Sequence, residues 1–383
     1  MFRNVLHRMS EISKRIIIST VVVVAVAALV IAAGIAAAQT NATGASTTTV
    51  GSPTDLKTVG PNNPDCVDVL VPSSVTDLPD GGKIYWYSSD GSLGQEPVPP
   101  ADFNPLMASD DELKQYGPFF KRPSDPAELQ HWKEKMSHIK FTGKHSPMCT
   151  TNKRFALTND GALTPIWAGG MTVNGTTNWN TYTIADGGWL QTGFRADCGV
   201  SDSNYGTWAG LGGYNNNNGQ HRLIQAGTEA DTYSPNVNAI YPFWEMLNDS
   251  HRNTSVRFDG DVINPGDQVE AWAHYDTNYQ MAWMAVTDWT INRNWYIGYS
   301  YYNNDTASNY WDGTTADFIT EEPPGYKLRK PYLGNTYFNW AEANNQPIAN
   351  FDSWRIYQYN GGYIQGSTFD GIHAWYDIWN SCI

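Results

Sequence analysis

The sequence lacks the motifs that mark several common classes of hydrolase. It has no C-x-x-C pair, no H-E-x-x-H and no G-x-S-x-G elbow, and neither D-T-G nor D-S-G of the pepsin type. An E-x-D-x-x-E carboxylate series is missing as well. Zinc-dependent, serine-dependent and pepsin-like hydrolysis are therefore not indicated, and we expect neither a metal site nor a cofactor.

Positive charge is scarce in the C-terminal part of the chain. From Phe155 onward, 9 Lys and Arg stand against 23 Asp and Glu, which accounts for the whole net charge of −14. An acidic surface with few lysines repels nucleic acid and anionic lipid, so neither is expected as a partner. An acidic surface that serves solubility alone is the alternative explanation.

A long apolar run occurs at the N-terminus. Residues 16–38 carry no charge and follow a basic flank, which is the pattern of a secretion signal or a signal anchor. The run is long enough to span a bilayer, and it ends in small residues that suit cleavage. We expect residues 1–38 to direct export, so that the remaining chain lies outside the cell, either secreted or anchored by this helix.

Cysteine is rare, but its count is even. Four cysteines in an exported chain allow two disulfides with three possible connectivities. The pairs Cys66–Cys149 and Cys198–Cys382 are favoured, because each then lies within one of the segments defined below. Five sequons also suit an extracellular glycoprotein: Asn41, Asn174, Asn248, Asn253 and Asn304.

Composition divides the rest of the chain into three segments. Residues 39–63 are rich in Ser, Thr, Gly and Asn and predict a flexible linker. Residues 64–154 form a basic, mixed region, with nine Lys and Arg against three acidic residues between Lys114 and Arg154. We interpret this region as an inhibitory prosegment, with 114–154 bound intramolecularly to the acidic part of the same chain. A small accessory domain is the alternative.

One helix stands out in the basic region. The sequence D-P-A-E at 125–128 is typical of a helix start, with proline at the first helical position. An apolar stripe follows at helical spacing, which predicts that the helix docks on another element. The stripe consists of Leu129, Trp132, Met136 and Ile139.

Residues 155–383 predict an all-β domain. Fourteen of the sixteen tryptophans lie here, and short aromatic or β-branched runs alternate with turn signals such as N-P-G-D at 264–267. V-E-A-W-A-H-Y and Y-Q-M-A-W-M-A-V alternate around a turn, as in a hairpin. This pattern is typical of a sandwich of antiparallel sheets or a barrel. Within this domain a helical period occurs only in D-G-I-H-A-W-Y-D-I-W at 370–379. We expect the protein to be a monomer.

Several strand-like runs carry polar residues where an apolar one is expected. Two-residue alternation places these side chains on one face, opposite small or apolar residues that can fill a core. They are Trp208, Gln225, Glu245, Asp317 and Glu321, with Gly210 and Gly212 between them. Each alone is explained as a solvated strand residue, but together they predict a polar groove.

These runs resemble those of the glutamic peptidases (eqolisins), closest to the prokaryotic branch. The specific matches are L-I-Q-A-G-T at 223–228 and A-D-F-I-T-E-E-P at 316–323. W-A-G-G at 167–170, T-W-A-G-L-G-G at 207–213, F-W-E at 243–245 and L-G-N-T-Y-F-N-W-A-E-A at 333–343 follow the same order. The resemblance covers roughly residues 160–345 and implies a sandwich of two antiparallel sheets, like the concanavalin A-type jelly roll.

The resemblance also implies an acid-acting endopeptidase that needs no metal and uses a Gln–Glu dyad on polypeptide substrates. By motif position the dyad is Gln225 and Glu321, and Trp208 and Glu245 line the groove. Glu321 would take a proton from water and later protonate the leaving amine, while Gln225 would stabilise the oxyanion. An unperturbed glutamate titrates near ~4.3, so such a base works in mild acid.

This chain departs from the family pattern at two positions that we assign to substrate binding. Gly212 stands where fungal members carry an acidic residue, and Asp317 replaces the usual glutamate. A sandwich rich in Trp, Tyr and Asn could instead be a carbohydrate-binding lectin without hydrolytic activity. A cell-surface structural protein with this fold is a third possibility.

Overall fold

The structure is a computed structural model that describes most of the chain from Cys66 onward. The described residues are 47–48, 66–89, 92–151, 163–164, 167–173, 182–193, 203–213, 223–234, 237–247, 254–258, 262–300, 313–321, 335–351, 353–360, 363–365, 367–369 and 375–378. The chain separates into two units, residues 1–47 and residues 48–383, with the two-residue strand β1 (Thr47–Thr48) at the boundary. The second unit is described below.

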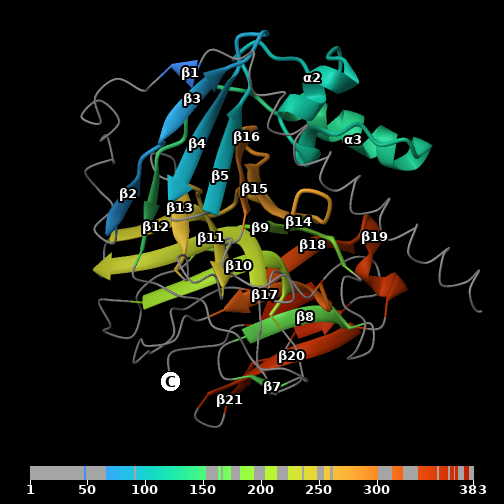
Figure 1. Cartoon of the computed structure of the whole chain (residues 1–383). Helices are drawn as coiled ribbons and strands as arrows, with labels where there is room; N and C mark the ends of the chain where they lie inside the picture. The colour runs from blue at the N-terminus through green and yellow to red at the C-terminus, as the bar shows by residue number, and fades with distance from the viewer. Residues whose placement is uncertain are drawn as a thin grey trace, which may run out of the picture. The chain divides into compact units, whose positions relative to one another are not determined.

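The second unit is an antiparallel β-sandwich, as the sequence predicts (Figure 1). The first sheet has the order β3-β4-β5-β16-β15-β14-β9-β18-β23-β22, and β19 also pairs with β18. Its strands are β3 (Ser74–Asp77), β4 (Lys83–Ser89), β5 (Ser92–Val98), β9 (Ile184–Leu190), β14 (Gln268–Asp276), β15 (Met281–Asp288), β16 (Arg293–Ser300), β18 (Asn335–Ala343), β19 (Gln346–Pro347), β22 (Ser367–Phe369) and β23 (Trp375–Ile378).

The second sheet has the order β2-β6-β13-β12-β11-β10-β17-β8-β20-β21, and β7 joins β20 in parallel. Its strands are β2 (Asp68–Leu70), β6 (Met148–Thr150), β7 (Leu163–Thr164), β8 (Trp167–Val173), β10 (Ser203–Gly212), β11 (Leu223–Ser234), β12 (Val237–Leu247), β13 (Val256–Phe258), β17 (Thr315–Glu321), β20 (Ser353–Asn360) and β21 (Tyr363–Gln365).

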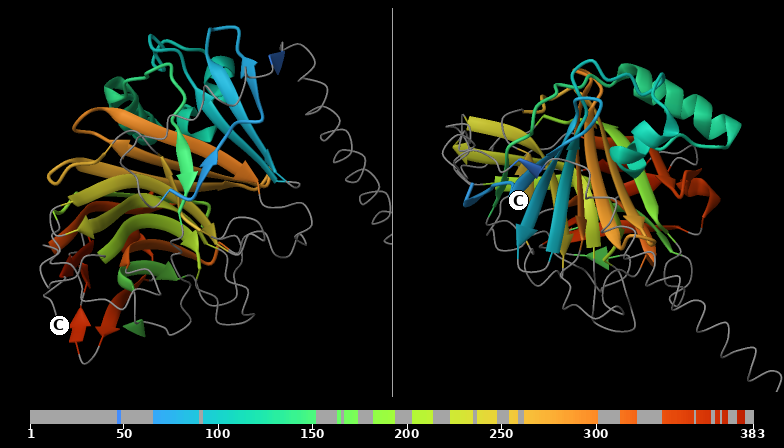
Figure 2. Two further views of the ribbon diagram at one scale, coloured as in Figure 1. Left: turned by 90° about the vertical axis from the view of Figure 1, so that its left-hand side faces the viewer. Right: turned by 45° about the horizontal axis from the view of Figure 1, so that its top comes forward.

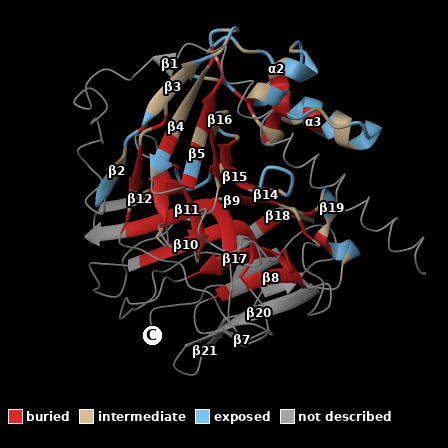
Figure 3. Ribbon diagram, in the orientation of Figure 1, coloured by how far each residue is buried: buried red, intermediate tan, exposed pale blue. Residues whose placement is uncertain are grey.

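The main core lies between the two sheets. Alternate residues of β10 and β14 point into it, including Ala209 and Leu211 from the second sheet and Ala271 and Ala273 from the first. These small side chains leave room for large aromatic rings such as Trp244, which stacks on Tyr299 with ring centroids 5.4 Å apart. Figure 3 shows that the central strands of both layers are buried almost throughout.

The helices pack on the outer face of the first sheet (Figure 2). They are α2 (Asp110–Gln115), the short 3-10 turn η3 (Pro118–Phe120) and α3 (Pro126–His138), and a further turn η5 (Ile348–Asn350) follows β19. The predicted helix start is confirmed, because the Asp125 side chain accepts hydrogen bonds from the backbone of residues 127 and 128. The predicted docking stripe is confirmed as well, since Trp132 and Met136 are buried in one cluster with Trp272.

The basic segment also contributes strands to both sheets. β5 pairs with β16 in the first sheet, and β6 pairs with β13 in the second. The Cys66–Cys149 disulfide is present, with Cα atoms 5.6 Å apart, and it lies wholly within this segment. The strands that precede residue 154 extend the sandwich, so residue 154 is not a boundary between two folded parts. Cleavage of the chain near this residue stays a prediction.

Two local expectations have opposite outcomes. The predicted hairpin is confirmed as β14 and β15, joined by a turn at residues 277–280. The helical period at 370–379 is misleading, because residues 375–378 form β23 and pair with β18. Backbone pairing with a neighbouring strand outweighs a short local periodicity that has no partner helix.

Several expectations fall outside the described residues. These are the apolar run at 16–38, the linker at 39–63 apart from residues 47–48, the five sequons, and the pair Cys198–Cys382. Within the described part of the chain, none of the helices has the length and apolar character needed to cross a bilayer.

Helix α3 is joined to the first sheet by a buried cation. Lys135, whose side chain is 11% exposed, forms ion pairs with Glu270 and, at 3.3 Å, with Asp186. Burial lowers the pKa of Lys135, but these two carboxylates more than offset that effect, so the ammonium stays charged. Burial raises the pKa of Glu270 to about 8 and that of nearby Glu342 to about 7, with Asp186 adding to both shifts.

Above about pH 8, where Glu270 is ionised, replacing Lys135 with alanine should destabilise the protein by about 3–5 kcal/mol, because it leaves buried carboxylates without their cation. Denaturant unfolding measures the loss. Lys133→Ala, at an exposed position on the same helix, is the matched control and should change the unfolding free energy by less than about 0.5 kcal/mol. Equal effects of the two substitutions would show that Lys135 does not hold α3.

Stability should fall as the pH rises from 5 to 8. Since the folded state holds the Glu270 and Glu342 protons more tightly than the unfolded chain, their contribution is complete below about pH 4.5. It is lost as the pH passes through about 7 and 8, by at most about 1.4 kcal/mol per group and pH unit. His274 has the opposite effect, because burial lowers its pKa from 6.5 to about 4. Its contribution to stability is present above about pH 6.5 and is lost as the pH falls towards 4.

Unfolding free energies measured from pH 4.5 to pH 8 test this dependence. Glu270→Gln removes one of the titrating groups and should flatten the curve. A parent protein that becomes more stable with rising pH, or a Glu270→Gln variant with an unchanged slope, would contradict the assignment.

Candidate active site

The face of the second sheet that points away from the main core carries all the predicted site residues. Trp208 and Ile319 on this face belong to a small separate cluster, whereas Ala209 and Phe318 on the other face belong to the main core. The alternation predicted from the sequence is therefore confirmed. We call this surface, from β8 to β12, the outer face of the second sheet.

Antiparallel register arranges the outer face in rows of directly opposed residues. The row through Gly210 reads, from β12 to β8, Glu245, Gln225, Gly210, Asp317 and Met171. The row through Trp208 reads Phe243, Gly227, Trp208, Ile319 and Gly169. The row through Gly206 reads Tyr241, Glu229, Gly206, Glu321 and Trp167.

Glycine occupies the centre of both rows that carry carboxyl groups. Gly210 separates Gln225 from Asp317, and Gly206 separates Glu229 from Glu321. At these two positions β10 itself adds no side chain between the opposed residues of β11 and β17. Gln225 and Glu321 lie on these two flanking strands and on the same face. Gln225 is opposite Gly210 and Glu321 is opposite Gly206, so the two are offset by four residues along β10.

The indole of Trp208 spans the distance between the two rows. Its Nε1 donates a hydrogen bond to Oε2 of Glu321 at 3.0 Å. At its other end, Cζ3 lies 3.0 Å from the position that a Cβ atom on Gly210 would occupy. Trp208 therefore connects Glu321 to the glycine directly opposite Gln225, and Trp167 packs edge-on against it at 5.1 Å between ring centroids.

Gln225 is held by a second carboxyl group. Its Nε2 donates to Oε2 of Glu245 at 2.8 Å, which fixes the orientation of the carboxamide. Its Oε1 is buried, and no donor among the described residues lies within hydrogen-bonding reach. A buried carbonyl oxygen without a donor is rare in native proteins and is a position where a water or a ligand donor binds.

The remaining predicted residues frame the Gly210 row. A carboxyl oxygen of Asp317 accepts a hydrogen bond from the Thr315 hydroxyl at 3.0 Å. The same hydroxyl lies 3.0 Å from the carbonyl oxygen of Gly212, the last residue of β10. Gly212, two residues further along β10 and opposite Leu223, has φ +83°, a conformation that favours glycine.

The outer face is closed, which differs from the open groove that the sequence predicts. Trp208, Gln225, Glu245, Asp317 and Glu321 are all 0% exposed. Sequence alternation can assign side chains to a face but cannot show what covers it. Gln225 and Glu321 become accessible from solvent only if the residues that cover the outer face move.

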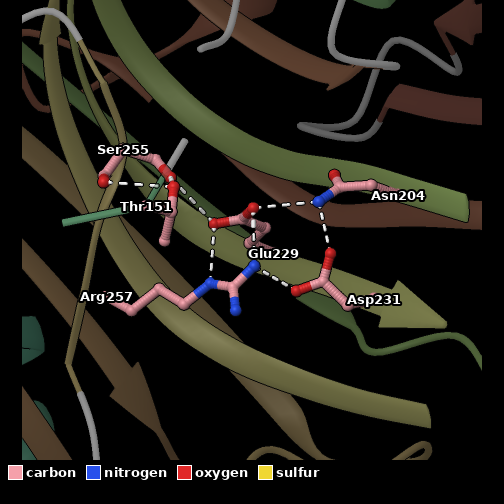
Figure 4. A network of polar contacts seen from close by, with 6 residues as sticks. All are labelled: Thr151, Asn204, Glu229, Asp231, Ser255 and Arg257. Carbon is pink, nitrogen blue, oxygen red and sulfur yellow. Dashed lines mark hydrogen bonds and ion pairs between the residues drawn. The ribbon is translucent and has the colours of Figure 1, made fainter. Parts of the chain in front are cut away.

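A buried polar network on the same face was missed by the sequence analysis (Figure 4). Arg257 of β13 donates to Glu229 from Nε at 3.1 Å and from Nη2 at 2.8 Å, and it pairs with Asp231 as well. Asn204 donates to Glu229 at 2.9 Å and to Asp231. Extending the alternation of Gln225 by four and six residues would have placed both carboxyl groups on this face.

Comparison with known proteins gives similarity of fold alone. No protein-family model and no curated protein matches the chain. Scytalido-glutamic peptidase with a transition state analog inhibitor is similar to it at 13% identity and a TM-score of 0.43. SCP-B, a member of the eqolisin family of peptidases in a complex with the tripeptide Ala-Ile-His, is similar at 11% identity and a TM-score of 0.40. Each alignment covers 57% of this chain and 98% of the other.

Removing the Trp208 donor should weaken the outer face. Trp208→Phe deletes the Nε1 hydrogen bond to buried Glu321, and hydrogen bonds to charged groups contribute about 1.5–3 kcal/mol. Trp244→Phe is the matched control, because Trp244 is equally buried and its Nε1 has no hydrogen-bond partner among the described residues. Urea unfolding should show a larger loss for Trp208→Phe, and equal losses would contradict the role of the donor.

Proposed function

We propose that this protein is an acid-acting endopeptidase in which Gln225 and Glu321 form the catalytic pair. The observation that carries the proposal is that both lie on one face of one sheet, on the strands that flank β10, with Trp208 between them. The sequence motifs around both residues and the fold similarity to two peptidases agree with it. Neither observation alone specifies the chemistry.

In the proposed mechanism Glu321 acts first as a general base. Its carboxylate removes a proton from water, and the resulting oxygen attacks the carbonyl carbon of the peptide bond. The Gln225 amide donates a hydrogen bond to the developing oxyanion and needs no change of protonation. Collapse of the tetrahedral intermediate breaks the C–N bond, and Glu321 returns its proton to the leaving amine.

The other site residues have supporting roles in this proposal. Glu245 orients Gln225 through the 2.8 Å hydrogen bond, and Trp208 orients Glu321 through its indole nitrogen. Gly210 and Gly212 add no side chains to the outer face, and Gly210 lies between Gln225 and Asp317. The side chains of Trp208 and Leu223, which lie against Gly210, would have to move to admit an extended substrate backbone. Substrate entry requires displacement of the side chains that close the outer face.

A lectin-like function is the alternative, and the closed outer face is an obstacle to it as it is to a peptidase. Sugar-binding tryptophans stack on the ring of a ligand and therefore need an exposed face. Trp167 and Trp208 on the outer face are 0% exposed. A glycan-binding screen that captures this protein while casein remains undigested would favour the lectin.

Export and self-inhibition stay proposals that rest on the sequence. Residues 1–38 support export, with the catalytic domain outside the cell. Among the described residues, α3 contacts the outer face of the first sheet, on the opposite side of the sandwich from Gln225. An inhibitory 114–154 segment, which includes α3, would therefore not act by filling the catalytic face with this helix.

Intact mass before and after incubation at acid pH tests the prosegment. Cleavage near residue 154, accompanied by a gain of activity, is the expected result. A chain that stays at full length and is equally active from neutral to acid pH would overturn the inhibitory role.

Casein digestion at about pH 3–4 tests the catalytic pair. Glu321→Gln and Gln225→Ala should fold normally and lose activity, the latter by about 10²–10³-fold for a lost oxyanion donor. Glu270→Gln is the matched control, because this glutamate is equally buried but lies on the first sheet. If Glu321→Gln digests casein as fast as the parent, Glu321 is not the base.

A further inference from the structure

The buried ion-pair network is close to Glu321 but takes no part in the mechanism described above. Glu229 and Glu321 are both directly opposite Gly206, one on each side of β10. Two strand spacings of about 4.8 Å therefore separate their backbones, and the intervening residue, Gly206, adds no side chain of its own. Any charge held at Glu229 acts on Glu321 through protein rather than through water.

The network holds buried charges in fixed positions through ion pairs and hydrogen bonds. Glu229, Arg257 and Asp231 have side chains that are 0–2% exposed. Arg257 grips Glu229 with two nitrogens and lies over the Tyr241 ring at 4.8 Å. Ser255 donates to Glu229 at 3.0 Å, and Thr151 bonds to Ser255 at 2.6 Å. The arrangement supplies one guanidinium for two carboxylates.

The charged and titratable side chains on the described outer face together determine the electrostatic potential at Glu321. Arg257 is basic, Tyr241 is neutral when protonated, and the others are carboxylic acids. These side chains come from β11, β12, β13 and β17: Glu229, Asp231, Tyr241, Glu245, Arg257 and Asp317. Within the described part of this face, Arg257 is therefore the one full positive charge that offsets the negative field at Glu321.

We propose that Arg257, paired with Glu229, is a positioning residue that sets the pH at which Glu321 becomes a carboxylate. This inference rests on the proposed function, because it concerns the base of that reaction. With Arg257 in place, Glu229 and Asp231 are compensated, and Glu321 can ionise in mild acid. Without Arg257, the carboxylates of Glu229, opposite Gly206, and of Asp231, opposite Asn204, lose this cation, and their negative charge favours the protonated form of Glu321.

The network also assigns a role to the N-terminal segment. Thr151 belongs to the segment predicted to be removed, and it hydrogen-bonds both the Ser255 hydroxyl and the Ser255 backbone oxygen. β6 lies beside β13, the strand that carries Arg257, in the same sheet. The predicted 64–154 segment therefore supports Arg257 from the side opposite Glu229.

Opposite charge substitutions provide the test. Arg257→Gln removes the positive charge, and Glu229→Gln removes a negative charge while keeping a side chain that can hydrogen-bond Asn204 and Arg257. One unit charge at about 10 Å shifts a buried titration by on the order of one pH unit. The Glu321 titration should therefore move up by about one unit in Arg257→Gln and down by about one unit in Glu229→Gln. The double variant should return to within about 0.3 of the parent value.

Two measurements follow the Glu321 titration in the full chain. The first compares unfolding free energy between pH 2.5 and 7 with and without Glu321→Gln in each background, since the difference reports proton uptake by Glu321 and needs no activity. The second is the acid limb of kcat/KM on casein. Lys133→Gln, which removes an exposed cation on α3, is the control and should leave both unchanged.

The outcomes separate this inference from the proposed function. Shifts of opposite sign in the two single variants support the role of Arg257, whereas a merely structural role lowers stability without moving the titration. An unmoved titration in both variants overturns the inference. If Arg257→Gln fails to fold, the Glu229→Gln variant alone tests the inference: a downward shift of the Glu321 titration supports it, and an unchanged titration overturns it. Equal proteolysis by the parent and Glu321→Gln overturns the proposed function, while the unfolding measurement still reports on Arg257.

Discussion

The candidate site depends on the pairing of β10 with β11 on one side and β17 on the other. From Gly206 to Gly212, β10 carries glycine or tryptophan on its outer face, whereas Tyr205, Ala209 and Leu211 point into the main core. The same strand therefore packs into the core on one face and forms the centre of the candidate site on the other. A Cβ atom on Gly227 would lie 2.0 Å from the backbone oxygen of Thr207, so this approach of β11 to β10 needs glycine. A shift of one residue in either register would exchange the faces and send Gln225 or Glu321 into the main core.

The second constraint is the burial of acidic groups. The outer face encloses five carboxyl groups, and burying charge is costly unless partners satisfy it. Trp208, Thr315 and Gln225 each donate to one of these groups, and Arg257 compensates two others. Both sheets therefore carry buried acidic groups, and burial raises the pKa values of Glu270 and Glu342 on the first sheet.

Local patterns predicted much of this arrangement. Two-residue alternation placed Gln225 and Glu321 on a common face, the turn at 277–280 joined the expected hairpin, and Asp125 began the expected helix. The errors and omissions involve partners that are remote in sequence. The helical period near Trp375 yields to pairing with β18, and Arg257 meets Glu229 only because β11, β12 and β13 lie side by side. No spacing along the chain encodes these contacts.

The amino-acid sequence by itself determined the all-β class, the face on which each polar strand residue lies, and the residue types available for acid–base chemistry. These properties follow from side-chain alternation and composition, which are local. Only the tertiary structure decided that the face is closed, that the segment before residue 154 adds strands to both sheets, and that Arg257 lies beside Glu229. Those features depend on which strands become neighbours, because burial and electrostatic compensation arise between residues that are distant in the chain.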